Sequence, residues 1–432
     1  MRWRHAALFV VVAIYVATSG VLIVLLDYGR EACSAGVHGR WVACDQIDHL
    51  GLINDLIEHP SSVLDYGNPG LIATLPGFHL LVALVARLLG YEALGPDTWL
   101  RLVPFGFGLG VAWILWRIYR DLSSDPSYAA LLCLPILWSH YFYLSSLFLV
   151  TDNAAYLGYV FLLLAYLRFP QRGLAIGLAA TAMVSARQIF LPVIATHFFA
   201  LARGVRPRSL DRGCVAAILL GVLPPIAVVL VCVLAWRGLV PPEVRSFHEG
   251  RSFVELGPIV QAVGLTGVLA IPYGFLAYPA LLGLERRRVV TIVAVASAAA
   301  VALWLLTPTT RDLDAGRWGS FVWLLARISP AIGERALLVL PALLVGFVAA
   351  GLMIELARVR HYLPIELIMF ALYVAALSMQ LLSFQRYSEV VTLITLSATA
   401  ARLGPPPGLG AVAFAAAFAT KLVLTIVMPQ AG

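Results

Sequence analysis

Long apolar runs separated by short polar stretches recur along the whole chain. Many hold about 18 to 25 residues, which is the length that an α-helix needs to cross the hydrocarbon core of a bilayer. Backbone polar groups in lipid must be satisfied within the segment itself, so helices are expected. The apolar segments are 7–26, 71–90, 99–118, 128–149, 153–168, 174–186, 190–202, 214–236, 258–283, 289–306, 335–357, 362–383, 388–402 and 408–428. The pattern predicts an all-α, polytopic transmembrane bundle of about 12 to 14 membrane-embedded helices.

Composition agrees with an integral membrane protein. Apolar residues make up 61% of the 432 residues, charged residues only 12%, and the mean hydropathy is +0.90. A soluble globule of this length needs far more polar surface. The lipid bilayer is therefore an expected partner. No linker or soluble domain interrupts the runs, so residues 1–432 are expected to form a single domain.

The arginines indicate how the chain is threaded through the membrane. The net charge of +7 is carried almost wholly by arginine, because Lys421 is the only lysine. Basic residues in short loops remain in the cytoplasm, and they give no indication of nucleic acid as a partner. The groups expected in the cytoplasm are Arg2 with Arg4, Arg168 with Arg172, Arg203 to Arg212, Arg286 to Arg288, and Arg358 to His361.

This threading requires breaks in two apolar runs. The arginines after residue 202 return to the cytoplasm only if the run 174–202 breaks at Ser185–Gln188, which puts Arg187 at the outer surface. One of the three apolar segments before Asp152 must also fail to cross. Segment 128–149 contains a proline and polar residues that favour an interfacial turn, and the proline-interrupted segment 71–90 is the other possibility.

The first polar stretch, residues 27–70, is unusually acidic for so apolar a chain. It is expected to be an extracytoplasmic loop. Asp45, Asp48 and His49 lie on one helical face by their i, i+3 and i+4 spacing. A carboxylate in such a stretch is usually solvated surface, but carboxylates at a membrane edge can also take a proton from an attacking hydroxyl. These three residues are candidate catalytic groups.

Other polar residues are expected on the same outer face. Asp152 stands at the start of an apolar helix, where it is a candidate N-cap as well as a candidate catalytic group. Arg187, followed by Gln188, is costly if it faces lipid and is expected to be functional or ion-paired. Arg386 with Tyr387 has a similar setting.

Purely structural roles remain open for several polar residues. Glu389, three residues after Arg386, offers it a local salt bridge. His79 lies on an apolar helix and is expected to be a packed core residue and not a ligand of a metal or substrate. Cys133, Cys214 and Cys232 lie in apolar runs and are expected to be inert. Cys33 and Cys44 share the first loop and can bridge if it faces an oxidising compartment.

Exposed carboxylates and membrane-edge arginines together suit a substrate that carries both a sugar and a lipid phosphate. Arginine binds phosphate bidentately. Arg187, Gln188, Arg386 and Tyr387 are therefore candidates for donor phosphate binding. The chain shows no Gly-rich phosphate loop and no His-rich or Cys-x-x-Cys metal pattern, so no nucleotide-sugar donor, cofactor or metal is expected. The N-terminal run is expected to be an uncleaved signal anchor.

The order of several short motifs resembles a known family. The acidic DxxxH stretch at Asp45, IATLPGFHLL, LRLVPF, LVTDNAAYLGYVFLLLAYL, SARQIFLP and FQRYSEV are similar to motifs of the eukaryotic dolichyl-phosphate-glucose-dependent α-1,2-glucosyltransferases, which are GT-C enzymes. The likeness covers about residues 45–200, with a weaker echo near 386. It implies a GT-C module over 1–202 and a variable membrane-embedded half over 203–432.

The resemblance also implies roles for individual residues. Asp45 and His49 match the ends of the family's DExxH motif, and Gln46 replaces its glutamate, so Asp48 is expected to supply the missing charge. It implies a first-loop acid acting as base, a second acid at Asp152, and an inverting transfer from a lipid-phosphate donor. Arg187 with Gln188 and Arg386 with Tyr387 match the family's RQ and RY pairs.

The expected function is transfer of a hexose, glucose-like by resemblance, from a polyprenyl-phosphate sugar to the hydroxyl of a glycan, glycolipid or protein acceptor. Abundant alanine, leucine, arginine and glycine are typical of GC-rich bacterial coding, which favours the inner (cytoplasmic) membrane with the active site facing the periplasm or cell exterior. The alternative from another class is a transporter or flippase for a lipid-linked or anionic solute. A non-catalytic scaffold would leave Arg187 unexplained.

Overall fold

The chain is all-α in the computed structural model. The structure describes residues 6–25, 41–64, 73–90, 99–204, 212–245, 254–310, 312, 316, 317, 319–380, 383–406, 408, 410–416 and 418. Within these ranges almost every element is a helix, and the strands are limited to one two-residue hairpin, β1 (Ala331–Ile332) with β2 (Arg335–Ala336). The predicted fold class is confirmed at this level.

The chain forms two compact units, and each is described by itself. The N-terminal unit comprises residues 9–115 and 140–248, and the C-terminal unit comprises residues 1–8, 116–139 and 249–432. Helix α6 (Leu102–Ser123) contributes its residues up to Leu115 to the first unit and those from Trp116 on to the second. The boundary that the resemblance implies near residue 202 stays a prediction.

The N-terminal unit holds most of the predicted site. Its elements are α1 (Ala6–Leu25, from Phe9 on), α3 (Trp41–Glu58), the 3-10 helix η2 (Pro60–Leu64), α4 (Gly77–Leu89), α8 (His140–Leu147), α9 (Asp152–Arg168), α10 (Gly173–Ala186), η3 (Gln188–Ala195), α11 (Thr196–Gly204), α12 (Arg212–Trp236) and η4 (Pro242–Val244).

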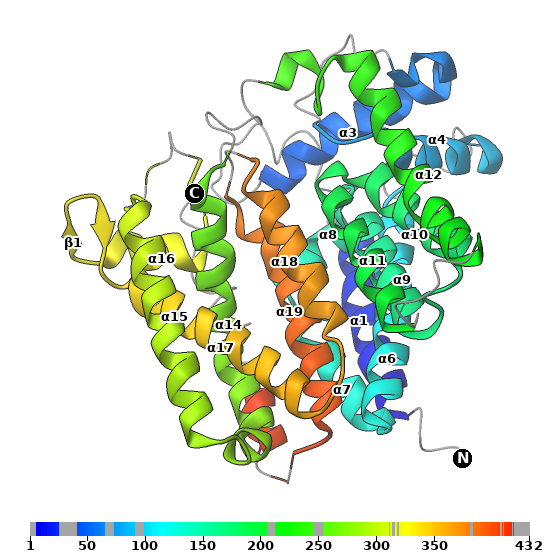
Figure 1. Cartoon of the computed structure of the whole chain (residues 1–432). Coiled ribbons are helices and arrows are strands. Elements are labelled where there is room, and N and C mark those ends of the chain that lie inside the picture. Colours follow the sequence, from blue (N-terminus) through cyan, green and yellow to red (C-terminus); the bar gives the residue numbers. More distant parts are fainter. Residues whose placement is uncertain are drawn as a thin grey trace. The chain divides into compact units, whose positions relative to one another are not determined.

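The C-terminal unit is built from longer helices. Its elements are α7 (Pro126–Leu137), α14 (Leu256–Leu282), α15 (Arg286–Leu306), α16 (Phe321–Ile328), the β1–β2 hairpin, α17 (Val339–Val359), α18 (Ile365–Leu377) and α19 (Gln385–Leu403). Helix α17 packs against both α14 and α15, and α19 packs against α7, α14 and α18 (Figure 1).

Several helices are long and apolar enough to cross a membrane. Among the described residues there are five, which are α6, Gly213–Trp236 of α12, α14, α15 and α17, and the pair α7 and α8 counts as a sixth if it forms one broken span. These helices indicate a membrane-embedded protein. Shorter apolar helices such as α4, α10 and α18 accompany them. The higher count of about 12 to 14 embedded helices stays a prediction.

The sequence places some helix boundaries well and others poorly. The predicted break at Ser185–Gln188 is confirmed, because α10 ends at Ala186 and Arg187 is extended at φ −148° and ψ 109°. Segment 128–149 is likewise divided into α7 and α8. The helix predicted from residue 335 instead begins at Val339, since Arg335 and Ala336 pair with β1 across a turn at Gly333, whose φ is +59°.

Helices of the N-terminal unit approach closely where glycine faces a neighbouring backbone. A Cβ added at Gly158 of α9 would lie 2.6 Å from Met183 Cα of α10, and one added at Gly177 of α10 would lie 2.0 Å from the Leu220 carbonyl oxygen of α12. Small residues at such crossings let membrane helices gain dispersion contacts that bulky side chains prevent. Helix α10 is therefore held tightly between α9 and α12.

Helix α19 buries polar side chains whose hydroxyl groups form hydrogen bonds within the C-terminal unit. Its residues 387–401 are all buried, although they include serines and threonines. The hydroxyl of Thr395 donates to the Val391 carbonyl at 2.9 Å, and that of Thr399 donates to the Thr395 carbonyl at 3.0 Å. Hydrogen bonds to the preceding turn satisfy these groups inside an apolar bundle.

The close crossing of α10 and α12 gives a stability prediction. Gly177→Ala should destabilise the protein by about 1–3 kcal/mol, because its methyl group overlaps the Leu220 carbonyl and forces the helices apart. The measurement is the thermal unfolding midpoint of the purified protein in one detergent. Gly106→Ala is the matched control, because a Cβ there meets nothing within 4 Å. Equal midpoints for the two variants would contradict the packing.

Candidate active site

The acidic stretch forms a helix in the part that the structure describes. Residues 41–58 are helical as α3, in agreement with the helical spacing predicted for Asp45, Asp48 and His49. The cause is a stripe of buried side chains at Gln46, His49, Ile53 and Leu56, whose spacing of three and four residues gives the helix one inward face. The stripe is easily overlooked because two of its members are polar.

Asp45 and Asp48 flank this buried face. Both side chains are partly exposed on α3, whereas His49 is only 7% exposed. The predicted grouping of the three residues on one side of a helix therefore divides into two partly exposed carboxylates and one buried imidazole. Of the three side chains, the two carboxylates are the more accessible to solvent.

Gln46 ties α3 to the chain segment that leads into α9. Its side-chain oxygen accepts a hydrogen bond from the Leu149 N–H at 3.1 Å, and Gln46 is 2% exposed. Leu149 is three residues before Asp152. The tie therefore brings the turn of α3 that carries Asp45 beside the chain that carries Asp152. An amide suits this position because it is uncharged, whereas an ionised glutamate would carry a negative charge into a buried environment.

His49 makes the second tie, to α4. Its Nδ1 lies 2.7 Å from Nε2 of His79, and the two rings stack with centroids 5.0 Å apart. Phe78 packs edge-on against both imidazoles. His79 is completely buried, so the expectation that it is a packed residue is confirmed. The pair fixes the rotation of α3 and hence the direction of its carboxylates.

Asp152 and Arg187 form a buried ion pair. Arg187 Nε lies 3.0 Å from Asp152 Oδ1, and its Nη2 donates to Oδ2 at 3.2 Å. Nε also donates to the Thr151 hydroxyl at 3.2 Å. The side chains are only 6% and 13% exposed for Asp152 and Arg187. This bidentate geometry is the strongest form of a carboxylate–arginine contact, and it confirms that Arg187 is ion-paired.

The backbone explains how this pair forms. Helices α9 and α10 pack against each other, so the start of one meets the end of the other. Arg187 is the first extended residue after α10, and its side chain reaches the first turn of α9. The prediction that Asp152 is an N-cap is wrong. Thr151 holds that position, and the Asp152 carboxylate turns to the guanidinium instead.

Gln188 serves as a tie between two other segments. Its Nε2 donates to the carbonyl of Ala73, just before α4, and to the carbonyl of Leu239 at 3.2 Å. An amide nitrogen has two N–H donors, and these two carbonyls engage both of them. In this arrangement Gln188 holds the chain around Arg187 and offers no donor to a phosphate.

A buried polar cluster behind Asp152 was not anticipated from the sequence. Tyr15 of α1 donates to the Ser146 hydroxyl, and Asn153 Nδ2 donates to the same hydroxyl at 2.7 Å and to the Pro104 carbonyl at 3.4 Å. All three side chains are almost completely buried. Gly108 allows the close approach, since a Cβ there would lie 2.5 Å from the Tyr15 oxygen. Polar residues within apolar runs were the available signal.

Arg386 and Tyr387 belong to the C-terminal unit. The Arg386 guanidinium lies 5.1 Å from the ring centres of both Phe384 and Tyr387, and Nη2 donates to the Tyr387 hydroxyl at 3.3 Å. The two aromatic faces hold the cation at the start of α19. The prediction that this arginine faces the same donor as Arg187 stays a prediction.

Glu389 anchors the same turn of α19. Its carboxylate accepts hydrogen bonds from the Ser139 hydroxyl at 2.7 Å and from Gln385 Nε2, and Glu389 is 1% exposed. Gln385 in turn accepts from the Phe321 N–H at 2.8 Å. These bonds link α19 to the end of α7 and the start of α16 within the C-terminal unit.

Among the described residues, no group of three or more histidine, cysteine, aspartate or glutamate side chains is placed to hold a metal ion. Cys133 and Cys232 are buried free thiols, as expected for packing residues, and Cys214 is partly buried. The possible Cys33–Cys44 bridge lies outside the described residues. Comparisons with models of protein families, with curated proteins and with solved structures find no match to this chain.

The buried ion pair gives a second prediction. Asp152→Asn should lower stability by about 3–5 kcal/mol, because it leaves the Arg187 charge buried without its carboxylate. The double variant Asp152→Asn with Arg187→Gln should recover most of that loss, since no uncompensated charge remains. Thermal unfolding in detergent measures both.

The matched control for this cycle is Asp121→Asn. Its partner Arg120 lies 3.3 Å away, but about a third of each side chain is exposed, so the loss should stay below about 1 kcal/mol. A double variant as unstable as the sum of its two single variants would show that the charges of Asp152 and Arg187 are not coupled.

Proposed function

We propose that the chain is an integral membrane glycosyltransferase of the GT-C type, which transfers a sugar from a polyprenyl-phosphate donor to an acceptor hydroxyl. The observation that carries the proposal is the buried Asp152–Arg187 pair, tied through Gln46 to a helix with two partly exposed carboxylates. The N-terminal unit then contains both a cation that can bind a phosphate, Arg187, and carboxylates that can accept the proton of a hydroxyl.

The carboxylate of Asp45 acts as the general base. It takes the proton of the acceptor hydroxyl as that oxygen attacks the anomeric carbon, and the bond from this carbon to the phosphate oxygen breaks. The polyprenyl phosphate leaves with the bonding electron pair, and attack from the opposite face inverts the anomeric centre. Asp48, one turn further along α3, supplies negative charge beside the acceptor.

Arg187 stabilises the charge that develops on the leaving phosphate. Asp152 and Thr151 hold the guanidinium in one orientation before the donor arrives, so less order has to be created on binding. Asp152 is then a positioning residue for Arg187 as well as the second acid of the site. Gln188 supports the same segment through its bonds to Ala73 and Leu239.

The finer features of the proposal rest on the sequence. They are a bundle of about 12 to 14 embedded helices, a hexose resembling glucose, Arg386 with Tyr387 as further phosphate-binding residues, and an active site on the extracytoplasmic side of an inner membrane. The acceptor is a glycan, a glycolipid or a protein.

One observation supports the alternative of a transporter. Glu389 is a buried carboxylate that accepts hydrogen bonds from Ser139 and Gln385, on a helix lined with hydroxyl groups. Ionisable residues inside a membrane bundle often mark the path of a solute or proton. A transporter should lose solute movement when Glu389 is changed to glutamine, and no variant of a transporter should transfer sugar.

The test is transfer of radiolabelled sugar from a panel of polyprenyl-phosphate sugars in membranes that contain wild type or Asp45→Asn. The variant should be slower by about 10²–10⁴-fold, because it keeps the shape of the base and loses its proton-accepting charge. Asp55→Asn is the matched control on the same helix. Asp55 is 47% exposed beside His59, and its loss should change the rate by less than about twofold.

Each result of this assay has a definite meaning. Equal transfer by wild type and Asp45→Asn would remove Asp45 as the base and leave Asp48 as the candidate. A folded wild-type protein that transfers no sugar from any donor, with acceptors of all three classes present, would refute the glycosyltransferase. Arg187→Lys should chiefly lower kcat, since a lysine cannot place two donors on the leaving phosphate as its charge develops.

A further inference from the structure

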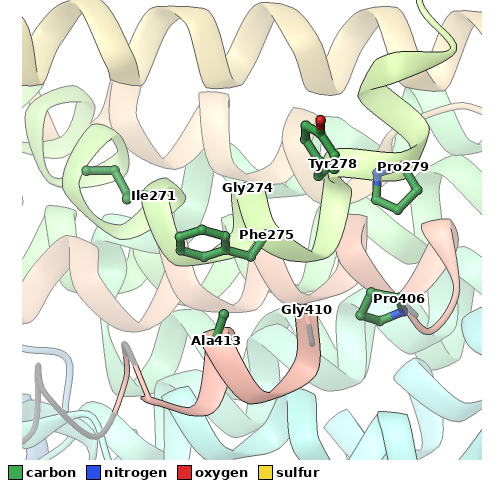
Figure 2. Close-up of a pocket in the computed structure, with 8 residues that line it drawn as sticks. All are labelled: Ile271, Gly274, Phe275, Tyr278, Pro279, Pro406, Gly410 and Ala413. Carbon is green, nitrogen blue, oxygen red and sulfur yellow. The ribbon is translucent and has the colours of Figure 1, made fainter. Parts of the chain in front are cut away.

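An apolar groove runs along α14 in the C-terminal unit, far along the chain from the residues proposed for catalysis. Figure 2 shows α14 on one side of the groove and the segment after α19 on the other. The volume of about 510 Å³ falls within the range of about 300–1,000 Å³ that is usual for small-molecule sites. The lining residues are Ile271, Gly274, Phe275, Tyr278, Pro279, Pro406, Gly410 and Ala413.

The lining excludes a polar ligand. The Tyr278 hydroxyl is the only polar side-chain atom among these residues, and it points away from the groove in Figure 2. Ile271, Phe275 and Tyr278 remain 58%, 49% and 60% exposed on a helix that is long and apolar enough to cross a membrane. A hydrocarbon chain satisfies such a surface, because it needs no hydrogen bonds.

The groove lies close to a turn rich in arginine. Helix α14 ends at Leu282, four residues or about 6 Å beyond Tyr278, and α15 begins at Arg286 with three consecutive exposed arginines. On the other wall, Arg360 Nη1 donates to the Arg402 carbonyl at 3.0 Å. Arg402 is four residues before Pro406, a chain length that spans at most about 14 Å.

Positive charge exceeds negative charge at this end of the unit. Three ion pairs form there between described residues, which are Arg288 with Glu285, Arg358 with Glu355, and Arg402 with Glu366. Arg286, Arg287 and Arg360 are exposed and take part in none of the ion pairs among the described residues. Three cationic side chains therefore remain to attract an anion beside an apolar groove.

We propose that this groove is a binding site for an anionic phospholipid. One acyl chain lies along α14 over Gly274 and Phe275, and the phosphate group lies against Arg286, Arg287 and Arg360. Tyr278 stands at the level where chain and headgroup meet, as interfacial aromatic residues do. Clusters of arginine at the end of membrane helices attract anionic lipid headgroups. The site is independent of the proposed glycosyl transfer.

Glycine at position 274 makes a direct test possible. A Cβ added there meets nothing within 4 Å, so the side chain of Gly274→Leu has room to enter the groove from α14. Purified protein is titrated with phosphatidylglycerol or phosphatidylcholine in detergent, and bound lipids are resolved by native mass spectrometry. Wild type should bind one phosphatidylglycerol at least about tenfold more tightly than phosphatidylcholine, and Gly274→Leu should lose this tight site.

Gly106→Leu is the matched control, because Gly106 is an exposed helical glycine of the N-terminal unit with the same open surroundings. It should keep the tight site. The combined change of Arg286, Arg287 and Arg360 to glutamine should weaken phosphatidylglycerol binding by about 100-fold. The same change at the exposed Arg87, Arg237 and Arg327 removes equal charge elsewhere and should weaken it far less.

Three results would overturn the proposal. The first is wild-type affinity for phosphatidylglycerol in folded Gly274→Leu, checked by an unchanged unfolding midpoint. The second is equal affinity of wild type for phosphatidylglycerol and phosphatidylcholine, which would leave the arginines without a role. The third is displacement of phosphatidylglycerol by a lower concentration of polyprenyl phosphate, which would make the groove a donor-tail site.

Discussion

The need to satisfy every charge inside an apolar bundle decides the arrangement of the N-terminal unit. Arg187 lies between two apolar helical segments, and the Asp152 carboxylate compensates its charge at 3.0 Å. To meet, the end of α10 and the start of α9 must come together, which requires the close crossing at Gly158 and the chain break at residue 187. The helix boundaries and the ion pair therefore depend on each other.

The same requirement governs the C-terminal unit in a different way. Glu366 accepts two hydrogen bonds from Arg402 at 3.0 and 3.1 Å, and the hydroxyls of Thr395 and Thr399 donate to carbonyls of the preceding turn of α19. These groups are internally satisfied, so they stabilise the bundle without presenting a polar surface to lipid.

Helix α3 shows how a site can be attached to such a bundle. Two buried polar side chains fasten it, Gln46 to the segment before α9 and His49 to His79 of α4. Each hydrogen bond adds only modestly to the free energy of unfolding. A buried polar group without a partner, however, would lower that free energy by its full desolvation penalty. The helix is therefore fixed in rotation, and Asp45 and Asp48 are held on its partly exposed side. The proposed role of Asp45 as a general base depends on this fixed geometry.

The sequence by itself determined the fold class and much of the segmentation. Apolar periodicity gave the helices, because lipid permits few other structures. The arginines that the positive-inside rule assigns to the cytoplasm predicted the break at Ser185–Gln188, and the cost of a charge in lipid predicted a partner for Arg187.

Only the tertiary structure decided which partner that is. The pairing of Asp152 with Arg187, of His49 with His79 and of Gln46 with Leu149 joins positions 35, 30 and 103 residues apart. No local spacing encodes such contacts, because they depend on how whole helices cross. For the same reason the sequence did not show which face of α3 is buried. Its inward stripe includes Gln46 and His49, which become buried only when distant segments supply their hydrogen bonds.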